Sequence, residues 1–283
     1  MPTISALYIY PVKSCGAIPL DTVQLTPHGL LPWDRHWMVV DPTGRFVSQR
    51  EYAVMARIRP QLTARELILT APVAETPLVI PLDPTGARER KAVSVWSDSL
   101  DALDEGDEAA RWFSAAIGTP VRLVRFADDV TRLASKKWTL DVDAPTHFAD
   151  GFPILVTNEA SLDDLNARLT SKGATAIPMT RFRPNIVLSG LDAFEEDFID
   201  TLSLGDITLR MAKPCARCPI TTIDQTSGER DPHWPHEPLD TMAGWRANSR
   251  VDGGLTFGQN AIVVSGSGGE LRVGAQADFE LAF

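Results

Sequence analysis

Short strand-like runs separated by proline, glycine and aspartate fill the first hundred residues, and they constrain the fold more than any other feature of the chain. Residues 4–12 form the first run, and 36–49 contains two runs divided by turn residues at 41–44, which predicts a hairpin. Further runs occur at 66–72, 76–82 and 91–96. This spacing is typical of a β-barrel or a small β-sandwich.

The pattern changes after residue 104. Apolar residues recur at helical spacing over 107–118, and Gly118 stands where a helix would end. Residues 120–126 return to a strand pattern, and the polar, weakly periodic stretch 127–151 is typical of a long loop. We therefore expect an N-terminal β-barrel-like domain in residues 1–125 and a second domain in residues 126–283.

The second half is also expected to be rich in strands. The predicted strands are 152–157, 184–190 and 203–214, followed by two or three strands within 260–283. A helix is predicted over 158–169, with Asn158 as its N-cap, and a looser helix over 238–247. The fold class expected from the whole chain is mainly β (α+β), with a few peripheral helices.

Composition and charge exclude several classes of protein. The 283 residues carry a formal net charge of -10 with 44% hydrophobic residues, which argues for a globular protein and against binding to nucleic acid or to an anionic membrane. No apolar run is long enough to span a membrane, and the start of the chain lacks a signal-peptide pattern, so we expect a cytoplasmic protein. Three cysteines are too few for a disulfide framework or a four-cysteine iron–sulfur cluster.

Two of the three cysteines, Cys215 and Cys218, form a C-x-x-C pair. A structural zinc site needs four protein ligands, and His233 and His236 could supply the other two. These histidines lie in a proline-rich stretch and no second C-x-x-C is present, which weakens this alternative. It nevertheless remains open at this point.

A redox dithiol is a second alternative for the pair, and two small buried side chains without chemistry are a third. A thioredoxin-like dithiol lies at a helix N-terminus, where the thiol pKa is lowered. Here Pro214 and Pro219 bracket the pair, and the β-branched residues 220–224 predict a strand. The local pattern therefore favours neither a redox helix nor a simple zinc motif.

Several separated segments occur together in the order found in one known family. They are YPVKSCGA (10–17), WDRHWMVVD (33–41), FPILVTNEASLDDLNARL (152–169), RFRPNIVLSG (181–190), KPCARCPITTIDQTSGE (213–229) and FGQNAIV (257–263). The chain resembles the MOSC proteins, named for the C-terminal domain of molybdenum cofactor sulfurase. It is most similar to the branch that contains the mitochondrial amidoxime-reducing component and its bacterial relatives. The resemblance covers nearly the whole chain and includes the N-terminal β-barrel domain of the family.

The resemblance implies a molybdenum cofactor, Mo-molybdopterin, whose pterin tail ends in phosphate, and not pyridoxal phosphate. It further implies that Cys218 supplies the thiolate ligand of the metal, while Cys215 is a neighbour. The chemistry agrees, because molybdenum bound by soft sulfur requires a deprotonated cysteine and the nearby Arg217 would favour the thiolate.

The same resemblance assigns residues to the anionic tail and the pterin. Lys13, Ser14, Arg35, Arg183 and Asn185 match the positions with which the family holds the cofactor. Arginine offers a planar fork of donors suited to phosphate, whereas lysine offers a point charge. Taken singly, Lys13 and Arg35 could also be ordinary solvated charges, and Asn185 could serve a turn.

A departure from the family pattern occurs at Asp150, Gly151 and Phe152. The family has an Asp-Thr-Ser-like segment at these positions, and only Asp150 keeps its residue type. The side-chain hydrogen bonds expected of the other two positions are therefore in doubt. Their backbone N–H groups could still bind the pterin.

Residues close to the cysteine pair complete the predicted site. Asp224 is predicted to be a catalytic or orienting residue, with Thr221 or Thr222 beside it. Asn260 stands where relatives carry an aromatic residue, so substrate contacts are expected to differ there. Cys15 is assigned no role, because a lone cysteine is usually a small buried hydrophobe.

The activity implied by the resemblance is the molybdenum-dependent reduction of N-hydroxylated compounds such as hydroxylamines, amidoximes and N-hydroxylated bases. The electrons are expected from a separate flavin or iron–sulfur protein, because this chain has no cysteine cluster of its own. The alternative is a carrier of the cofactor, or of a persulfide, without reductase turnover.

Overall fold

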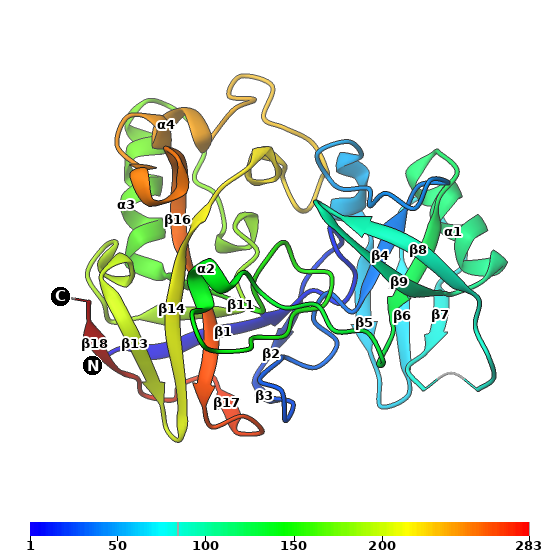
Figure 1. The fold of residues 1–283 in the computed structure, drawn as a ribbon. Coiled ribbons are helices and arrows are strands. Elements are labelled where there is room, and N and C mark those ends of the chain that lie inside the picture. Colours follow the sequence, from blue (N-terminus) through cyan, green and yellow to red (C-terminus); the bar gives the residue numbers. More distant parts are fainter. Residues whose placement is uncertain (84, 283) are drawn as a thin grey trace.

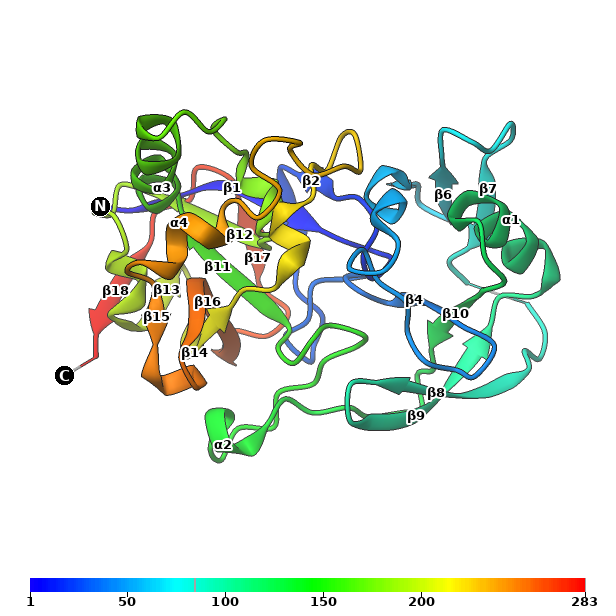
Figure 2. The same ribbon diagram turned by 90° about the horizontal axis from the view of Figure 1, so that it is seen from above.

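The computed structural model describes residues 1–83 and 85–282 and confirms a mainly β fold with four α-helices in that part of the chain. The strands form two bodies that lie side by side (Figures 1 and 2). We call residues 37–126 the N-terminal body, and residues 1–24 together with 154–281 the C-terminal body. No helix among the described residues is long and apolar enough to cross a membrane.

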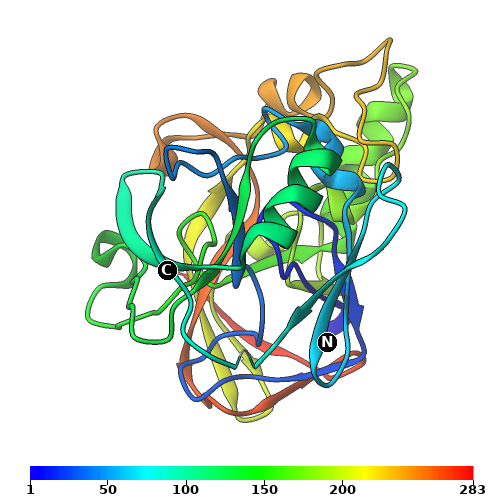
Figure 3. The same ribbon diagram turned by 90° about the vertical axis from the view of Figure 1, so that its right-hand side faces the viewer.

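The N-terminal body contains two small sheets and one helix. One sheet has the order β4 (Trp37–Val40), β10 (Arg122–Phe126), β9 (Asp98–Asp104), β8 (Arg90–Val95), and the other β5 (Arg59–Leu62), β6 (Glu66–Thr70), β7 (Leu78–Pro81). The predicted helix is confirmed as α1 (Asp107–Ile117), which lies across this body in Figure 3. It ends at Gly118, which adopts the left-handed conformation and donates its N–H to Ser114.

The predicted hairpin at 36–49 is formed only in part. Its turn is present, because Gly44 donates to the carbonyl of Asp41 over 2.9 Å and has a φ of 83°. After the turn, Val40 pairs with Phe46 through a single bridge and not through a second strand. Gly44 is required here, since a Cβ atom would lie 2.4 Å from the carbonyl oxygen of Ala92.

The C-terminal body is built on one large sheet. Its order is β18 (Asp278–Leu281), β13 (Ile199–Leu204), β14 (Ile207–Ala216), β16 (Gly254–Ser265), β11 (Ile154–Asn158), β12 (Ile186–Ser189), β1 (Thr3–Ile9), β2 (Ile18–Leu20), with β15 (Ala247–Asn248) on β16. The parallel pair β11 and β12 is joined by α3 (Glu159–Ser171), and the other pairs are antiparallel. Asn158 caps α3 as predicted, accepting a hydrogen bond from the N–H of Ala160.

The start of the chain belongs to the C-terminal body. β1 pairs with β12, and β3 (Thr22–Gln24) pairs with β17 (Glu270–Arg272). Leu7 and Leu25 accordingly lie in the same buried cluster as Val156. The first three strands of the chain therefore lie in sheets with strands of its second half, and β10 is the last strand of the N-terminal body.

The remaining predictions for the second half of the chain concern one helix, one long loop and several strands, and not all of them are confirmed. The helix expected at 238–247 is the short α4 (Leu239–Ala243), and the loop 127–151 contains only the single turn α2 (Lys136–Thr139). The strands expected near the C-terminus are present, while residue 283 lies outside the described residues. The strand predicted at 220–224 is wrong, because Pro219–Thr222 forms a 3₁₀ turn. Pro219 at its first position favours this turn over a strand.

The register of the large sheet brings several loops to one place. Because β1 is antiparallel to β12 and β12 is parallel to β11, the loop after β1 meets the loops before β11 and β12. The two long strands run past the same place, since Leu155 pairs with Asn260 and Asn260 pairs with Lys213. Segments far apart in the sequence therefore converge here.

Glu196 lies beneath the N-terminus of α3 and is fully buried. Its carboxylate accepts hydrogen bonds from Ser161 over 2.7 Å and from Asn158 over 3.3 Å. Burial raises the pKa of Glu196 to about 7, which the two hydrogen bonds only partly oppose. The folded state therefore binds a proton that the unfolded chain releases at lower pH.

We predict that Glu196→Gln stabilises the protein at alkaline pH. With the pKa raised on folding, the stability linked to this carboxyl is present below its unfolded pKa and is lost as the pH rises to about 7. The neutral amide avoids this loss, so at about pH 8.5 the variant should gain about 1 to 3 kcal/mol in the free energy of unfolding, with little change near about pH 5. Urea unfolding at both pH values measures this, and an equal effect at both would contradict the assignment.

Candidate functional site

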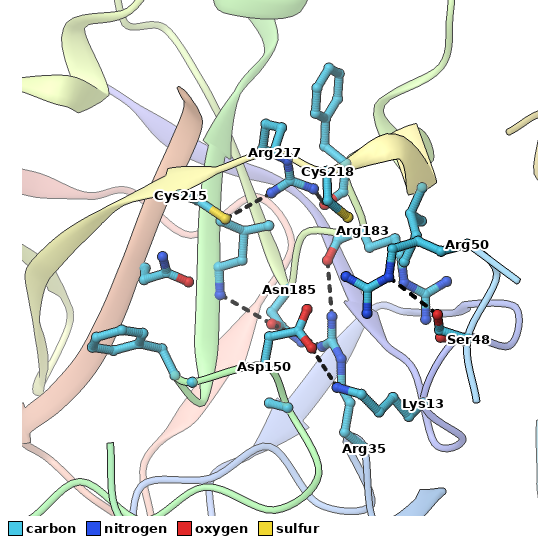
Figure 4. Close-up of a pocket in the computed structure, with 18 of the residues that line it drawn as sticks. Lys13, Arg35, Ser48, Arg50, Asp150, Arg183, Asn185, Cys215, Arg217 and Cys218 are labelled. Carbon is cyan, nitrogen blue, oxygen red and sulfur yellow. Dashed lines mark hydrogen bonds and ion pairs between the residues drawn. The ribbon is translucent and has the colours of Figure 1, made fainter. Parts of the chain in front are cut away.

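An open pocket of about 760 Å³, which includes its solvent-exposed part, lies where the converging loops meet the N-terminal body (Figure 4). Of the residues predicted for the site, the pocket is lined by Lys13, Ser14, Arg35, Asp150, Gly151, Phe152, Arg183, Asn185, Arg217 and Cys218. Cys215 and Asn260 also line it. Asp224 does not line it, and neither do Thr221 and Thr222, which were predicted beside it.

Three of these residues have backbones in the left-handed region. The φ angles are 66° for Ser14, 47° for Arg35 and 57° for Arg183. Residues other than glycine rarely adopt this conformation, and it persists only where the surroundings fix it. Tight loops thus hold each of these residues at the pocket.

Arg35 and Arg183 pack against the ring of Tyr10, with their guanidinium carbons 4.4 and 4.2 Å from its centroid. Arg35 is neutralised by Asp34, to which it donates over 2.8 and 2.6 Å. It also donates to the carbonyl of Arg183 over 3.1 Å. The two arginines are therefore locked in one buried unit around Tyr10.

Arg183 is not fully satisfied within the protein. One nitrogen, Nη1, donates to the carbonyl of Cys15 over 2.7 Å, while the buried Nη2 has no hydrogen-bond partner among the described residues. Burial lowers the pKa of Arg183 to about 10, so the group is still charged at neutral pH. A buried cation with a free donor is costly unless an anion pairs with it.

Lys13 and Asp150 form an ion pair at the other side of the pocket. The Lys13 amino group lies 2.5 Å from the carboxylate and donates to the carbonyl of Phe148 over 2.8 Å. Burial lowers the pKa of Lys13. Desolvation acts to raise the pKa of Asp150, but the charge and hydrogen bond of Lys13 outweigh it, so that pKa lies below its usual range.

Asn185 has a structural part in the pocket. Its side chain donates to the carbonyl of Tyr8 over 3.1 Å and accepts from the N–H of Leu155 and from Arg35, over 3.1 and 3.2 Å. The amide thus links β1, β11 and the arginine loop. Gly151 and Phe152 differ, because their backbone N–H groups bond to no other described residue and remain free to donate.

The two cysteines differ in their surroundings. Cys215 accepts a hydrogen bond from Arg217 over 2.8 Å, and Arg217 also donates to the carbonyl of Phe182 over 2.6 Å. Cys218 begins the 3₁₀ turn and is half-buried, and no described residue forms a hydrogen bond to its thiol. Figure 4 shows Arg217 between the two sulfur atoms. The free thiol is the one available to a metal.

The zinc alternative does not fit this arrangement. Among residues 1–83 and 85–282, no group of three or more histidine, cysteine, aspartate or glutamate side chains is placed to hold a metal ion. Cys215 and Cys218 are therefore not joined by His233 and His236 in a four-ligand site. Cys15 is buried in the N-terminal core, and burial raises the pKa of its thiol to about 12.

Asp224 lies next to the 3₁₀ turn Pro219–Thr222 and contacts it through Arg181. It accepts hydrogen bonds from the N–H groups of Thr226 and Ser227 and pairs with Arg181 over 3.2 Å. Arg181 in turn donates to the carbonyl of Thr221, within the turn that begins at Cys218. Asp224 and Thr222 line a second cavity on that side. Asp224 therefore helps to position the turn that carries Cys218 and does not line the pocket.

Seven residues that line the pocket are not among those predicted from the sequence: Phe46, Ser48, Arg50, Ala149, Leu155, Phe182 and Ile220. Phe46, Ser48 and Arg50 line the wall contributed by the N-terminal body. Phe46 and Ser48 lie within the predicted hairpin, Arg50 follows it, and none of the three matches a motif, so only the spatial convergence of the two bodies reveals them. With Arg50, five cationic side chains and a single carboxylate line the pocket of a chain whose net charge is -10. Such a pocket is suited to an anionic ligand.

Comparison with known proteins agrees with this geometry. Residues 1–120 match the MOSC N-terminal beta barrel domain, and residues 143–277 match the MOSC domain. The chain is 34% identical over 250 residues to human mitochondrial amidoxime reducing component 2, covering 86% of this chain and 72% of that protein. It is 32% identical over 251 residues to human mitochondrial amidoxime-reducing component 1, covering 86% of this chain.

A further relative is the bovine molybdenum cofactor sulfurase, which is 32% identical over 243 residues, covering 81% of this chain and 27% of that much longer protein. The names of these relatives connect them with molybdenum or with amidoxime reduction. The chain is a member of the MOSC domain family, and is related to the mitochondrial amidoxime-reducing components.

Proposed function

We propose that this protein is a molybdenum cofactor-dependent reductase of N-hydroxylated compounds. The observation that carries the proposal is the free thiol of Cys218 at a cationic pocket lined by Arg183, whose buried Nη2 has no partner among the described residues. Similarity to amidoxime-reducing components supports the choice of reaction.

The residues of the pocket fit the chemistry of such a cofactor. Cys218 would supply a thiolate to the metal, for which soft sulfur is a suitable ligand. Arg183, Lys13 and Ser14 would hold the phosphate end, and the free N–H groups of Gly151 and Phe152 would donate to the pterin. A pocket of about 760 Å³ with few internal counter-ions suits a ligand of this charge and size.

When bound, the cofactor would supply two-electron chemistry that converts an N–OH group, two electrons and two protons into an N–H group and water. The chain positions this chemistry. Arg217 fixes Cys215 and the backbone at Phe182, while Arg181 and Asp224 hold the turn that carries Cys218. The open side of the pocket leaves room for the substrate and for protons from solvent.

A separate protein is proposed as the electron donor. The chain has three cysteines in all, one of them buried in the N-terminal core, which cannot form a four-cysteine iron–sulfur cluster. A flavin or iron–sulfur protein would therefore deliver the electrons. Similarity to the sulfurase favours a second candidate, a carrier of the cofactor or of a persulfide.

One experiment separates the two candidates. Purified protein is assayed for molybdenum and for the reduction of benzamidoxime to benzamidine with a chemical reductant as the electron source. We expect close to one molybdenum per chain and turnover. Bound molybdenum without turnover would reject the reductase and leave the carrier.

We predict that the two cysteines respond differently to substitution. Cys218→Ser should reduce benzamidoxime turnover to background and lower the number of sulfur ligands in the molybdenum X-ray absorption spectrum by one, because the hydroxyl is a poor ligand for this metal while the two sulfurs of the pterin remain. Cys215→Ser is the matched control and should lower turnover by no more than about tenfold, as expected for a residue that orients its neighbour. Equal turnover and an unchanged spectrum in Cys218→Ser would disprove the ligand assignment.

We also predict that inorganic phosphate stabilises the cofactor-free protein through Arg183. A ligand that binds only the folded state raises the melting temperature. Phosphate should raise it by about 2–4 °C over chloride at equal ionic strength. Arg183→Gln should lose most of this difference, whereas Arg111→Gln, which removes an exposed arginine from α1, should retain it. The same phosphate effect in both variants would place the anion elsewhere.

A further inference from the structure

Arg50 is held at the pocket by aromatic rings and not by a carboxylate. Its guanidinium carbon lies 4.4 Å from the ring centroid of Trp96 and 5.7 Å from that of Phe46. Its Nε donates to the hydroxyl of the buried Ser48 over 3.3 Å. These contacts fix the guanidinium plane while its two terminal nitrogens make no hydrogen bond to another described residue.

Nearby carboxylates are already engaged with other cations. Glu51, the next residue in the chain, pairs with Arg45 over 2.7 Å. Asp150 pairs with Lys13 and also accepts a hydrogen bond from the Nε1 of Trp96 over 3.1 Å. Among the described residues, Arg50 therefore has no salt-bridge partner. Its charge remains available to a ligand in the pocket.

Trp96 provides a flat apolar surface next to this charge. It is 50% exposed, has a φ of 57°, and lies in the tight turn between β8 and β9. An edge-to-face contact with Phe46, with centroids 5.1 Å apart, and the hydrogen bond to Asp150 hold the indole in place. An exposed, strained and doubly anchored tryptophan beside a free guanidinium is suited to recognising a planar group that carries an anion.

We propose that Arg50 and Trp96 select N-hydroxylated substrates that carry a carboxylate or phosphate on a planar ring. This inference rests on the proposed reductase function and names the substrate class. The terminal nitrogens of Arg50 bind the anionic group, and the exposed face of Trp96 contacts the ring. Specificity is thus provided by the N-terminal body, while the thiol and the arginines of the converging loops belong to the C-terminal side of the pocket.

The anion bound by Arg50 is separate from the one assigned to Arg183. Arg183 and Arg35 share the ring of Tyr10, whereas Arg50 lies against Phe46 and Trp96 beside Ser48. Figure 4 shows Arg50 beside Ser48 on one side of the pocket, with Cys215 and Arg217 on the other. Loss of the cofactor in an Arg50 variant would contradict this separation.

Kinetics with a matched pair of substrates test the proposal. Benzamidoxime and 4-carboxybenzamidoxime differ only in the carboxylate, so their ratio of kcat/KM isolates its recognition. Arg50→Gln should lower the ratio of the anionic to the neutral substrate by about tenfold, the effect of one charge-assisted hydrogen bond. Arg50→Lys keeps the charge without the planar fork and should recover part of the ratio. Arg65→Gln, an exposed arginine of the same body, should retain the wild-type ratio.

Binding to the cofactor-free protein gives a readout that does not depend on turnover. Calorimetric titration with 4-carboxybenzamidoxime should show binding that weakens about tenfold in Arg50→Gln and in wild type at high salt. Trp96→Ala should weaken it as well, because the ring loses its apolar contact. Unchanged binding in Arg50→Gln and Trp96→Ala would overturn the proposal.

The outcomes keep the two hypotheses apart. Failure of wild type to reduce either amidoxime rejects the reductase, while the titration still decides whether Arg50 binds the carboxylate. Turnover of both compounds with an unchanged ratio in Arg50→Gln supports the reductase and rejects the role of Arg50. A fall in molybdenum content in Arg50→Gln would assign this arginine to the cofactor and also reject the proposal.

Discussion

The side chain of Asn185 is the contact on which the pocket depends. It is buried, and it is satisfied only when β1 offers the carbonyl of Tyr8 and β11 offers the N–H of Leu155. An unpaired buried amide is costly, so this one side chain favours a single alignment of three strands. That alignment brings the loops of Lys13, Asp150 and Arg183 to one place. The site is therefore a consequence of strand register as much as of the loops themselves.

Burial makes the charged forms of Lys13 and Arg183 less favourable than they would be in water. Burial lowers the pKa of both Lys13 and Arg183, which means that the protein around them disfavours their charge. Asp34 and Asp150 compensate Arg35 and Lys13, but Arg183 retains a free buried donor. An anion that pairs with this donor would recover that cost. Fixed groups of this kind give affinity because their ordering was completed on folding.

The sequence predicted those features that depend on neighbouring residues. Gly118 and Asn158 mark helix ends through their own conformation and hydrogen bonding, and both positions are as expected. Pairing between β1 and β12 joins residues 179 to 186 positions apart, and no local pattern encodes it. The β-branched residues after Cys218 predict a strand, but Pro219 favours a turn, and the structure has a 3₁₀ turn there. The resemblance to a family predicted most of the residues that line the pocket. Arg50 matches no motif, and its place at the pocket follows only from the three-dimensional structure, in which it packs against Phe46 and Trp96.

The division of the pocket between two bodies has a consequence for how such a site can vary. The thiol, Arg183 and the free backbone N–H groups lie in loops whose positions are set by the register of the large sheet. Arg50 and Trp96 lie on turns of the N-terminal body, where side chains can change without breaking a strand pair. The groups proposed to bind a cofactor are thus positioned by the sheet, while those proposed to contact a substrate are not. Under this proposal, substitutions on the turns of the N-terminal body change the choice of substrate and leave the cofactor chemistry intact.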